Sequence, residues 1–518
     1  MIDNYVINEN PITIKRALIS VFDKNGIEEF AKFLSEKNIE IVSTGGTSAL
    51  LKKAQIPIVE INDFTNFPEI MGGRVKTINP LVEGGILALR DQHESDMMMN
   101  NINQIDLVVC NLYPFTTVIK NKDHTLSDAL ENIDIGGPTM IRSAAKNVGW
   151  VVVATHPNDY ALIIQELNKE GEISYNTRIS LAKKAFATTA SYETAISNYI
   201  SKDEYPSQMG LTLKKHSELR YGENPHQSAS AYQISENNSN NILNAKQLQG
   251  KKLSYNNIMD GDAALSCLKE FTETACVIVK HANPCGVSTG ESSLEAFNRA
   301  FAADSVSAFG GIIAMNSKCT NEIAKELDKI FVEIVIAPSF DSEALDIFAK
   351  KKNLRIMQIG DIKSTPIGHD IRNLEGGLLI QEINRDRLTI NELNIVTKKS
   401  PTNEQLQSML FGWRVLKHVK SNAIITIKDK TTVGIGAGQV SRIDAVEIAL
   451  IKSGRYIKNS ILCSDAFFPF RDSIDRVSKS ELGAIIQPGG SIKDLEVIDA
   501  CNEYEIPMVF TGRRCFKH

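Results

Sequence analysis

The sequence predicts an α/β protein, with an amino-terminal parallel-sheet domain followed by a larger α/β domain that carries an internal duplication. Strand-like and helix-like segments alternate through the first 200 residues, which is typical of a helix-flanked parallel sheet. A polar segment then interrupts the pattern, and the remaining chain matches itself at an offset of 150 positions. We expect domains at 1–200, 213–390 and 391–518, with a linker at 201–212.

Short apolar runs mark the strands of the first domain. They lie at Ala17–Phe22, Ile39–Val42, Asp106–Cys110 and Trp150–Ala154. After Gly26, apolar residues recur at helical spacing up to Leu34. Because ligands of open α/β sheets bind at the carboxyl ends of the strands, we expect the site there.

The duplication rests on a gapless match between two parts of the second domain. Residues 333–339 align with 483–489, and the match extends to Leu345 with Leu495 and to Ile356 with Ile506. A looser pair aligns the segment that starts at Asp304 with the segment that starts at Asp465. We interpret the two parts as paired α/β halves of one catalytic unit.

Composition and charge exclude several classes of protein. The 518 residues are 42% hydrophobic and carry a net charge of -5, which gives no broad surface for nucleic acid. The chain shows neither a signal-peptide core nor a membrane-spanning run, and its eight cysteines are scattered. We therefore expect a cytoplasmic protein with reduced thiols and no membrane partner.

Three Gly-Gly segments of the first domain suit an anionic ligand. The first, Ser43–Thr47, follows a strand and opens a helical stretch at 48–53, so its amides and hydroxyls favour a phosphate monoester. It is neither a Walker A loop nor a dinucleotide fingerprint. The second segment places Arg74 and Lys76 directly after a Gly-Gly pair. The third Gly-Gly pair precedes a predicted helix that begins at Pro138 and carries Arg142 and Lys146 on one face.

The runs PEIMGGRVKT (68–77), NLYPF (111–115) and NIDIGGPTMIRSAAKN (132–147) resemble the inosine monophosphate (IMP) cyclohydrolase domain. The resemblance implies a methylglyoxal-synthase-like fold with catalytic residues Lys76, Tyr113, Asp134 and Lys146. It implies that the nucleotide is held by Ser20, Lys24, Asn25, Ser43, Thr44, Gly45, Gly46, Thr47, Arg74, Thr77, Gly136 and Gly137. One departure is Phe22, where the family usually has Ser, so one phosphate contact is in question.

Ring closure needs little beyond these residue types. A carboxamide nitrogen attacks a formyl carbon of the same molecule and water leaves. The protein therefore orients groups that the substrate already carries and stabilises transient charge. Lysine, tyrosine, a carboxylate and loop amides suffice without a metal.

In the second domain, Lys280 and His281 end a strand-like run just before what we expect to be an irregular loop. A histidine can take a proton from a weakly nucleophilic amine, and a neighbouring lysine can stabilise negative charge. A zinc nucleobase deaminase is the competing hypothesis, because its signature is H-x-E followed by P-C-x-x-C. Here Asn283 stands in place of the glutamate. Cys285 matches the first cysteine of the signature, but Ser288 stands in place of the second, so zinc would lack a ligand and we reject catalytic zinc.

The runs LRYGENPHQ (219–227), KHANPCG (280–286), SVSAFGG (305–311), SNAI (421–424), GIGAGQVSR (434–442) and SDAFFPFRD (464–472) resemble the aminoimidazole carboxamide ribonucleotide (AICAR) formyltransferase family. The resemblance implies a duplicated cytidine-deaminase-like fold without the metal. It implies Lys280, His281 and Asn422 as catalytic residues. Nucleotide-site positions would be Arg220, Tyr221, His226, Asn257, Phe309, Gly310, Glu333, Phe467, Arg514 and Phe516.

Together the two resemblances predict a bifunctional enzyme of purine synthesis. It would transfer a formyl group from 10-formyltetrahydrofolate to the 5-amino group of AICAR, giving FAICAR, and then close FAICAR to IMP. They also imply a homodimer with shared formyltransferase sites, and they leave open a structural monovalent cation. The alternative from another class is a regulatory module that binds a nucleotide without chemistry.

Overall fold

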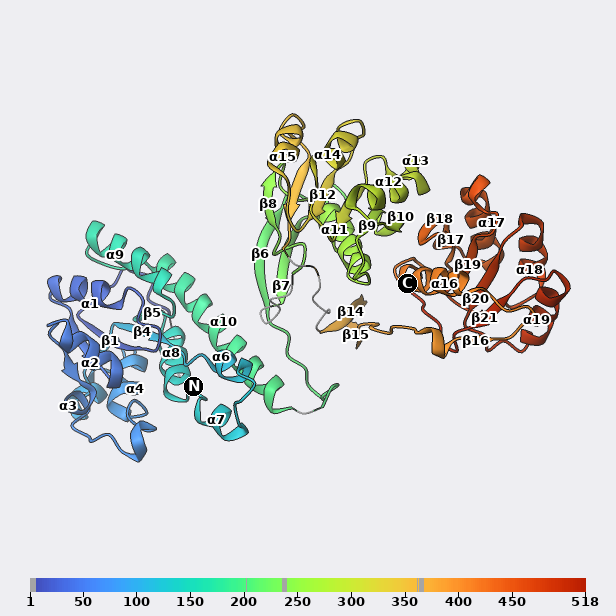
Figure 1. Ribbon diagram of the computed structural model, residues 1–518. Helices are drawn as coiled ribbons and strands as arrows, with labels where there is room; N and C mark the ends of the chain where they lie inside the picture. The colour runs from blue at the N-terminus through green and yellow to red at the C-terminus, as the bar shows by residue number, and fades with distance from the viewer. Residues whose placement is uncertain (1–5, 202, 235–239, 361, 363–367) are drawn as a thin grey trace. The chain divides into compact units, whose positions relative to one another are not determined.

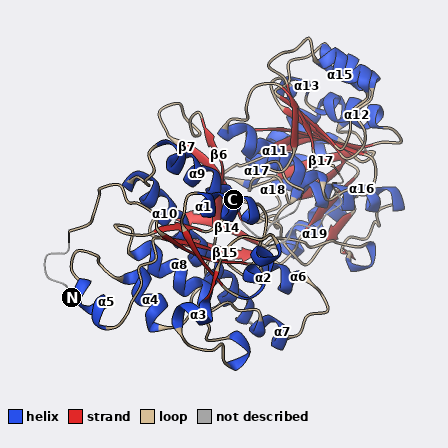
Figure 2. Ribbon diagram, turned by 90° about the vertical axis from the view of Figure 1, so that its left-hand side faces the viewer, coloured by secondary structure: helices blue, strands red, loops and turns tan. Residues whose placement is uncertain are grey.

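The computed structural model describes residues 6–201, 203–234, 240–360, 362 and 368–518. The chain divides into two compact units, Met1–Thr212 and Leu213–His518, called unit 1 and unit 2 below. Both units combine helices with β-sheet (Figures 1 and 2). Within the described residues, no helix is long and apolar enough to cross a membrane.

A five-stranded parallel sheet forms the centre of unit 1, in the order β3-β2-β1-β4-β5. Its strands are β1 (Arg16–Val21), β2 (Glu40–Ser43), β3 (Val59–Glu60), β4 (Leu107–Asn111) and β5 (Val152–Ala154). The sequence pattern predicted four of them and missed the two-residue β3. The chain runs from β1 outward to β3 and then returns to β4 on the other side of β1. The topological switch point therefore lies between β1 and β4, where α/β sheets bind ligands.

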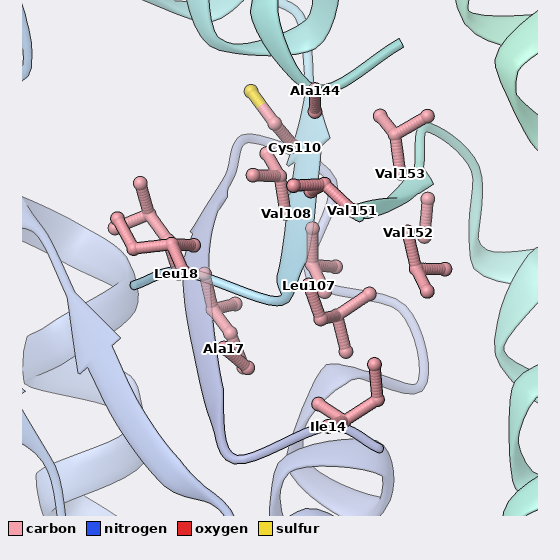
Figure 3. Close-up of a cluster of buried hydrophobic side chains, with 14 of the residues drawn as sticks. Ile14, Ala17, Leu18, Leu107, Val108, Cys110, Ala144, Val151, Val152 and Val153 are labelled. Carbon is pink, nitrogen blue, oxygen red and sulfur yellow. The ribbon is translucent and has the colours of Figure 1, made fainter. Parts of the chain in front are cut away.

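The helices of unit 1 connect and cover these strands. They are α1 (Ile27–Glu36), α2 (Gly45–Lys53), α3 (Ile61–Thr65), α4 (Pro80–Leu87), α5 (Glu94–Met99), α6 (Phe115–Lys120), α7 (Leu126–Glu131), α8 (Gly136–Lys146), α9 (Tyr160–Lys169) and α10 (Tyr175–Ile200). Figure 3 shows part of the core, where Leu18 of β1, Val108 of β4 and Ala144 of α8 are buried together.

Two helix starts differ from the sequence prediction. Helix α2 begins at Gly45, so the expected phosphate loop already forms its first turn. Helix α8 begins at Gly136, which moves Pro138 from the predicted first position to the third. Proline is tolerated there because the first-turn amides of a helix have no intrahelical acceptor.

Unit 2 is built on a mixed twelve-stranded sheet whose two halves have the same strand order. In the first half the order is β10-β9-β11-β12-β13, and in the second it is β18-β17-β19-β20-β21. The halves join where β10 pairs antiparallel with β18. Each half begins with a helix and an antiparallel hairpin and continues with alternating helices and parallel strands. The division of this unit at residue 390 stays a prediction.

The elements of the first half are α11 (Tyr255–Leu268), β9 (Ala275–Lys280), β10 (Asn283–Thr289), α12 (Ser293–Ala303), α13 (Ser305–Ala308), β11 (Ile312–Met315), α14 (Asn321–Asp328), β12 (Ile334–Ala337), α15 (Ser342–Phe348) and β13 (Arg355–Gln358). Those of the second half are α16 (Asn403–Leu416), β17 (Ile424–Lys428), β18 (Thr431–Gly436), α17 (Arg442–Ser453), β19 (Ile461–Ser464), α18 (Asp472–Val477), β20 (Ala484–Gln487), α19 (Asp494–Glu503) and β21 (Met508–Phe510). Strands β8 (Lys246–Gln249) and β16 (Asn394–Ile395) extend the sheet, and β6 (Leu213–Leu219) with β7 (Ala229–Ile234), and β14 (His369–Leu374) with β15 (Gly377–Glu382), form separate hairpins.

Strand pairing corrects two details of the predicted self-alignment. Val335 pairs with Ile356, and the equivalent Ile485 pairs with Met508, so Ile356 corresponds to Met508 and not to Ile506. The gapless match therefore ends after β20. The looser pair was also wrong, because Asp304 precedes β11 whereas Asp465 follows β19. The residue equivalent to Asp465 is Asn316, since each accepts a hydrogen bond from the backbone before the hairpin of its half.

Candidate functional site

A cavity of about 710 Å³ lies at the switch point of unit 1. Residues at the ends of β1 and β4 and at the start of α2 line it, together with residues of segments 72–77 and 130–140. Twelve predicted site residues are among the lining residues: Ser20, Lys24, Thr44, Gly46, Thr47, Arg74, Lys76, Thr77, Tyr113, Asp134, Gly136 and Gly137.

Hydroxyl groups and one ammonium form a polar cradle after β1 and β2. The Thr47 hydroxyl donates to the carbonyl of Val21 at 3.0 Å and accepts from Lys24 Nζ at 2.8 Å. Ser20 Oγ and Thr44 Oγ1 lie 3.0 Å apart. Burial, with the nearby Lys76 charge, lowers the pKa of Lys24. The cradle thus concentrates donors and positive charge, as an anion requires.

Two helix starts add to this positive field. Within the described residues, neither Thr44 before α2 nor Ile135 before α8 caps its helix with a side-chain hydrogen bond. The helix dipole is positive at both starts, although at α8 the Gly137 amide already donates to Asp134 Oδ1. A Cβ added at Gly45 would lie 3.1 Å from Lys76 Nζ, which places that ammonium beside the start of α2.

Tyr113, Asp134 and Lys76 form the titratable group of the cavity. Burial raises the pKa of Asp134, while hydrogen bonds from the Gly137 and Tyr113 backbone and the charge of Lys76 act in the opposite direction. Burial and the Asp134 charge raise the pKa of Tyr113. A carboxyl that interacts electrostatically with both a phenol and an ammonium can move protons, and the phenol and the ammonium can stabilise an oxyanion.

Two close approaches fix the start of α8 against these groups. The amide of Gly137 donates to Asp134 Oδ1 at 2.8 Å, and a Cβ at Gly137 would lie 2.5 Å from the other carboxylate oxygen. A Cβ at Gly136 would lie 2.5 Å from Thr77 Oγ1. Glycine at both positions is therefore a requirement of packing. Across the cavity, Arg74 forms an exposed ion pair with Glu131.

Four predicted residues of unit 1 lie outside the cavity lining. Ser43 is buried and donates its hydroxyl to the carbonyl of Ile19, and Asn25 is exposed after β1. Gly45 lies between the lining residues Thr44 and Gly46, and a Cβ there would lie 3.1 Å from Lys76 Nζ. Lys146 is exposed at the last residue of α8, about 15 Å along the axis from the helix start. Its catalytic role stays a prediction from the resemblance.

Sequence reasoning missed two residues that hold this site together. Asn111 Oδ1 accepts from the amides of Phe22 and Asp23 at 2.6 and 2.9 Å, so it fixes the loop after β1. The Tyr192 hydroxyl accepts from the Asp134 amide at 2.8 Å. Asn111 stood inside a quoted motif, whereas Tyr192 on α10 gave no signal that sequence pattern could detect.

In unit 2, Lys280 and His281 occupy a tight hairpin turn, which corrects the expected irregular loop. His281 and Ala282 both have positive φ, 53° and 56°, and Asn283 pairs with Lys280 as β10 begins. Two central residues with positive φ match the right-handed twist of a hairpin. Pro284 indicated a loop, but the ladder accommodates it with an irregularity between Pro284 and Gly286.

The direction of the strands brings the remaining predicted groups to the same edge of the sheet. Strands β9, β18, β19, β20 and β21 end at this edge, and β10, β11, β12 and β17 begin there. Residues that follow the first set or precede the second therefore share one edge. They include Lys280, His281, Gly310, Glu333, Asn422, Phe467 and Arg514.

Hydrogen bonds orient the first-half residues. Lys280 Nζ donates to the carbonyl of Phe309 at 2.7 Å, and the Gly310 amide donates to the carbonyl of Phe331 at 2.8 Å. Glu333 accepts from Asn257 Nδ2 at 2.9 Å and pairs with Arg355 at 3.2 Å.

Sequence reasoning did not single out Asp260 or weigh Asn283 as an orienting residue. Asp260 Oδ1 accepts from the Ala282 amide at 2.7 Å, which braces the turn that carries His281. Burial raises the pKa of Asp260, whereas backbone hydrogen bonds and the His281 charge act to lower it. Asn283 donates to the carbonyl of His281 at 3.2 Å and accepts from the Lys420 amide at 3.1 Å. Asn283 thus connects the hairpin turn of the first half with the segment that carries Asn422.

Asn422 is held at both ends of its carboxamide. Its nitrogen donates to the carbonyls of Gln439 and Val440 at 2.9 and 3.0 Å, and its oxygen accepts from Arg442 at 2.8 Å. Arg442 is itself paired with the fully buried Asp465. Such a side chain is preorganised, because its supporting groups are fixed.

A second cavity, of about 630 Å³, lies beside Asn422 at the carboxyl ends of β19, β20 and β21. Phe467, Arg514 and Phe516 line it, and the Arg514 guanidinium lies 4.9 Å from the Phe516 ring centre. Gly489, Gly490 and Gly512 provide close backbone. Arg220, Tyr221 and His226 lie apart from this lining on a loop between β6 and β7, where Arg220 stacks on Tyr221 at 4.7 Å.

The residues at the two cysteine positions of the deaminase motif lie in β10 and bind groups of the neighbouring strands β9 and β18. Cys285 Sγ donates to the carbonyl of Ile278, and burial raises the pKa of its thiol to about 12. Ser288 Oγ lies 2.8 Å from Thr431 Oγ1. Among the residues described, His, Cys, Asp and Glu form no group of three that could hold a metal ion.

The fold and the two sites define a two-unit α/β enzyme, with an anion-binding cavity on a parallel sheet and a second polar site on a duplicated mixed sheet. A model of the AICARFT/IMPCHase bienzyme family matches residues 144–452, and a model of the MGS-like domain matches residues 26–139. The bifunctional purine biosynthesis protein PurH of Caldicellulosiruptor saccharolyticus is 48% identical over 97% of this chain and 100% of its own. PurH of Acetivibrio thermocellus is 49% identical over 98% and 100%.

A crystal structure of ForH aligns with 36% of this chain and 100% of its own at 32% identity, with a TM-score of 0.33. The chain belongs to the AICARFT/IMPCHase bienzyme family, and is thus an AICAR formyltransferase and IMP cyclohydrolase of purine biosynthesis. The MGS-like match confirms the fold class predicted for the amino-terminal domain. Family membership decides against the regulatory module and the zinc deaminase.

Proposed function

We propose that unit 1 carries the IMP cyclohydrolase activity and unit 2 the AICAR formyltransferase activity. The observation that carries the first assignment is the position of Lys76, Tyr113 and Asp134, which line one cavity beside the hydroxyl cradle. A nucleotide phosphate in the cradle directs its ring toward these groups, since the cradle and the three side chains line the same cavity.

In ring closure, the carboxamide nitrogen of FAICAR forms a bond to the formyl carbon and gives up a proton. The formyl C=O double bond becomes a single bond, its oxygen carries the negative charge, and the proton from the carboxamide nitrogen converts it to a hydroxyl. The hydroxyl then leaves as water with a second proton, which comes from the formamide nitrogen as that nitrogen forms a double bond to the same carbon. We assign the oxyanion to the Lys76 ammonium and the Tyr113 hydroxyl, and the proton transfers to Asp134, because its raised pKa suits both acceptance and return. Lys146 lies outside the cavity, so Lys76 is the cation assigned to the reacting atoms.

In formyl transfer, the 5-amino group of AICAR attacks the formyl carbon of 10-formyltetrahydrofolate. His281 accepts the amine proton, while Lys280 and Asn422 stabilise the oxyanion and the departing folate nitrogen, which takes up a proton as its bond to the formyl carbon breaks. The hairpin turn braced by Asp260, and the carboxamide held by Arg442, support these roles because both groups are fixed before substrate arrives. The nucleotide-site roles carried over from the resemblance, among them Asn257, Glu333, Phe467 and Phe516, belong to the same proposal.

The co-substrate and partners are part of the proposal. The formyl donor is 10-formyltetrahydrofolate, and no catalytic metal takes part. No site is assigned to a structural monovalent cation. We propose a cytoplasmic homodimer with shared formyltransferase sites that binds neither nucleic acid nor membrane. Eight free cysteines suit a reducing compartment.

A coupled assay tests the whole assignment. Protein is mixed with AICAR and 10-formyltetrahydrofolate, and FAICAR and IMP are separated and quantified. FAICAR followed by IMP is the expected sequence of products. Folded protein that yields neither would refute the assignment, and FAICAR without IMP would refute the role of unit 1 alone.

A further inference from the structure

Phe22 places an aromatic ring in the cavity of unit 1. Its side chain is 50% exposed, and Tyr113, 44% exposed, lines the same cavity. The two ring centres lie 5.3 Å apart with an interplanar angle of 62°. An edge-to-face pair of this kind is a favourable arrangement of two rings.

The position of Phe22 in the chain links the anion cradle to the titratable group. Val21 precedes Phe22 and holds Thr47 of the cradle, and Lys24 follows two residues later. On its other side, the Phe22 ring contacts Tyr113. Because Asn111 accepts the Phe22 amide at 2.6 Å, the backbone that carries the ring is fixed. Phe22 therefore lines the same cavity as both the cradle and Asp134, and it adjoins Tyr113.

We propose that Phe22 determines specificity at this site: with Tyr113 it forms an aromatic corner that receives the flat heterocycle of the nucleotide. The inference rests on the proposed cyclohydrolase role of unit 1. Half-exposed aromatic surface gains free energy when a planar ring covers it, whereas phosphate and ribose gain little from the contact. Phe22 therefore contributes affinity for the base and not for the phosphate.

The test compares two inhibitors of ring closure, with FAICAR supplied as substrate. IMP carries phosphate, ribose and base, whereas ribose 5-phosphate lacks the base. In Phe22→Leu, which removes the ring without adding a hydroxyl, we expect the inhibition constant of IMP to rise about 2- to 12-fold and that of ribose 5-phosphate to change less than about twofold. Phe22→Tyr keeps the ring and should keep the wild-type ratio of the two constants.

Phe186→Leu serves as the matched control, because Phe186 is a 42% exposed phenylalanine of unit 1 outside the cavity lining. It should also keep the wild-type ratio. A ratio of the two constants that stays at the wild-type value in Phe22→Leu would overturn the inference and leave ring closure assigned to unit 1. Wild-type protein that makes FAICAR but never closes it would overturn the cyclohydrolase assignment, and this inference with it.

Discussion

Replacement of Asp134 by Asn separates chemistry from structure at the cavity of unit 1. The Gly137 amide donates to Asp134 Oδ1 at 2.8 Å, and the Asn side chain keeps an acceptor at that atom, so helix α8 should still begin at Gly136. The structural cost is the charge at the helix start, about 0.3–1 kcal/mol, together with the charge-assisted part of the hydrogen bond from the Tyr113 backbone. Loss of the proton-transfer group should lower kcat for ring closure about 10²–10⁴-fold, which is about 3–5 kcal/mol.

The two magnitudes differ enough to be measured independently. With AICAR and 10-formyltetrahydrofolate supplied, Asp134→Asn should make FAICAR at a rate within about twofold of wild type, because Asp134 lies in unit 1, apart from the formyltransferase groups. FAICAR should accumulate while IMP forms slowly. Chromatographic separation of the two nucleotides over time gives both rates from one reaction.

Asp128→Asn is the matched control in this experiment. Asp128 also accepts a backbone amide at a helix start, from Thr125 at 2.9 Å, but it is exposed and outside the cavity lining. Its ring-closure rate should match wild type. The reasoning would be refuted if Asp134→Asn closed FAICAR within tenfold of wild type, or if it lost formyl transfer equally.

Three further predictions concern pH, the second site and stability. The rate of ring closure by the wild-type protein should fall as the pH drops through the pKa of Asp134, because protonation removes the base. That pKa should lie above the ordinary aspartate value of about 3.9, and the acid side of the pH profile of kcat/KM measures it. His281→Ala should lower formyl transfer about 10²–10⁴-fold, while supplied FAICAR still closes to IMP. Lys417→Met should destabilise unit 2 by about 3–5 kcal/mol at neutral pH in denaturant unfolding, because it leaves the carboxylate of Glu270 without its buried ammonium partner at 2.9 Å.

The sign of the last effect with pH follows from the pKa of Glu270. Burial acts to raise this pKa, but His418 and Lys417 outweigh burial, so the folded value is lowered. The stabilisation is complete above the unfolded glutamate pKa of about 4.3 and is lost as the pH falls through the lower folded value. The deficit of Lys417→Met should therefore shrink toward acid pH, and a deficit that grew there would contradict the prediction. The pH prediction would be contradicted by a ring-closure rate that does not fall at acid pH. The His281 prediction would be contradicted by near-normal formyl transfer in folded His281→Ala protein.

Motifs identified many site residues before the structure, but the structure decided how they are held. Lys280 and His281 were named from a strand end, yet the expected loop is the strand β10, because both turn residues adopt positive φ and the next residues pair with β9 and β18. Lys146 shared a motif with Asp134, but α8 carries it to the opposite end of the helix. Linear spacing does not show which residue of a helix faces a cavity.

By itself, the sequence determined the alternation of strands and helices, the glycines at the starts of α2 and α8, and the order of motifs that defines the family. These features depend on local backbone preferences and on hydrophobic periodicity, which are properties of short segments. Only the tertiary structure decided which residues meet: Lys76 beside the start of α2, Asn283 between His281 and Lys420, and the Phe22 ring against Tyr113. These neighbours are far apart in the chain, or they meet only because their side chains point toward one another. Strand order and packing determine both, and neither can be read from a short segment.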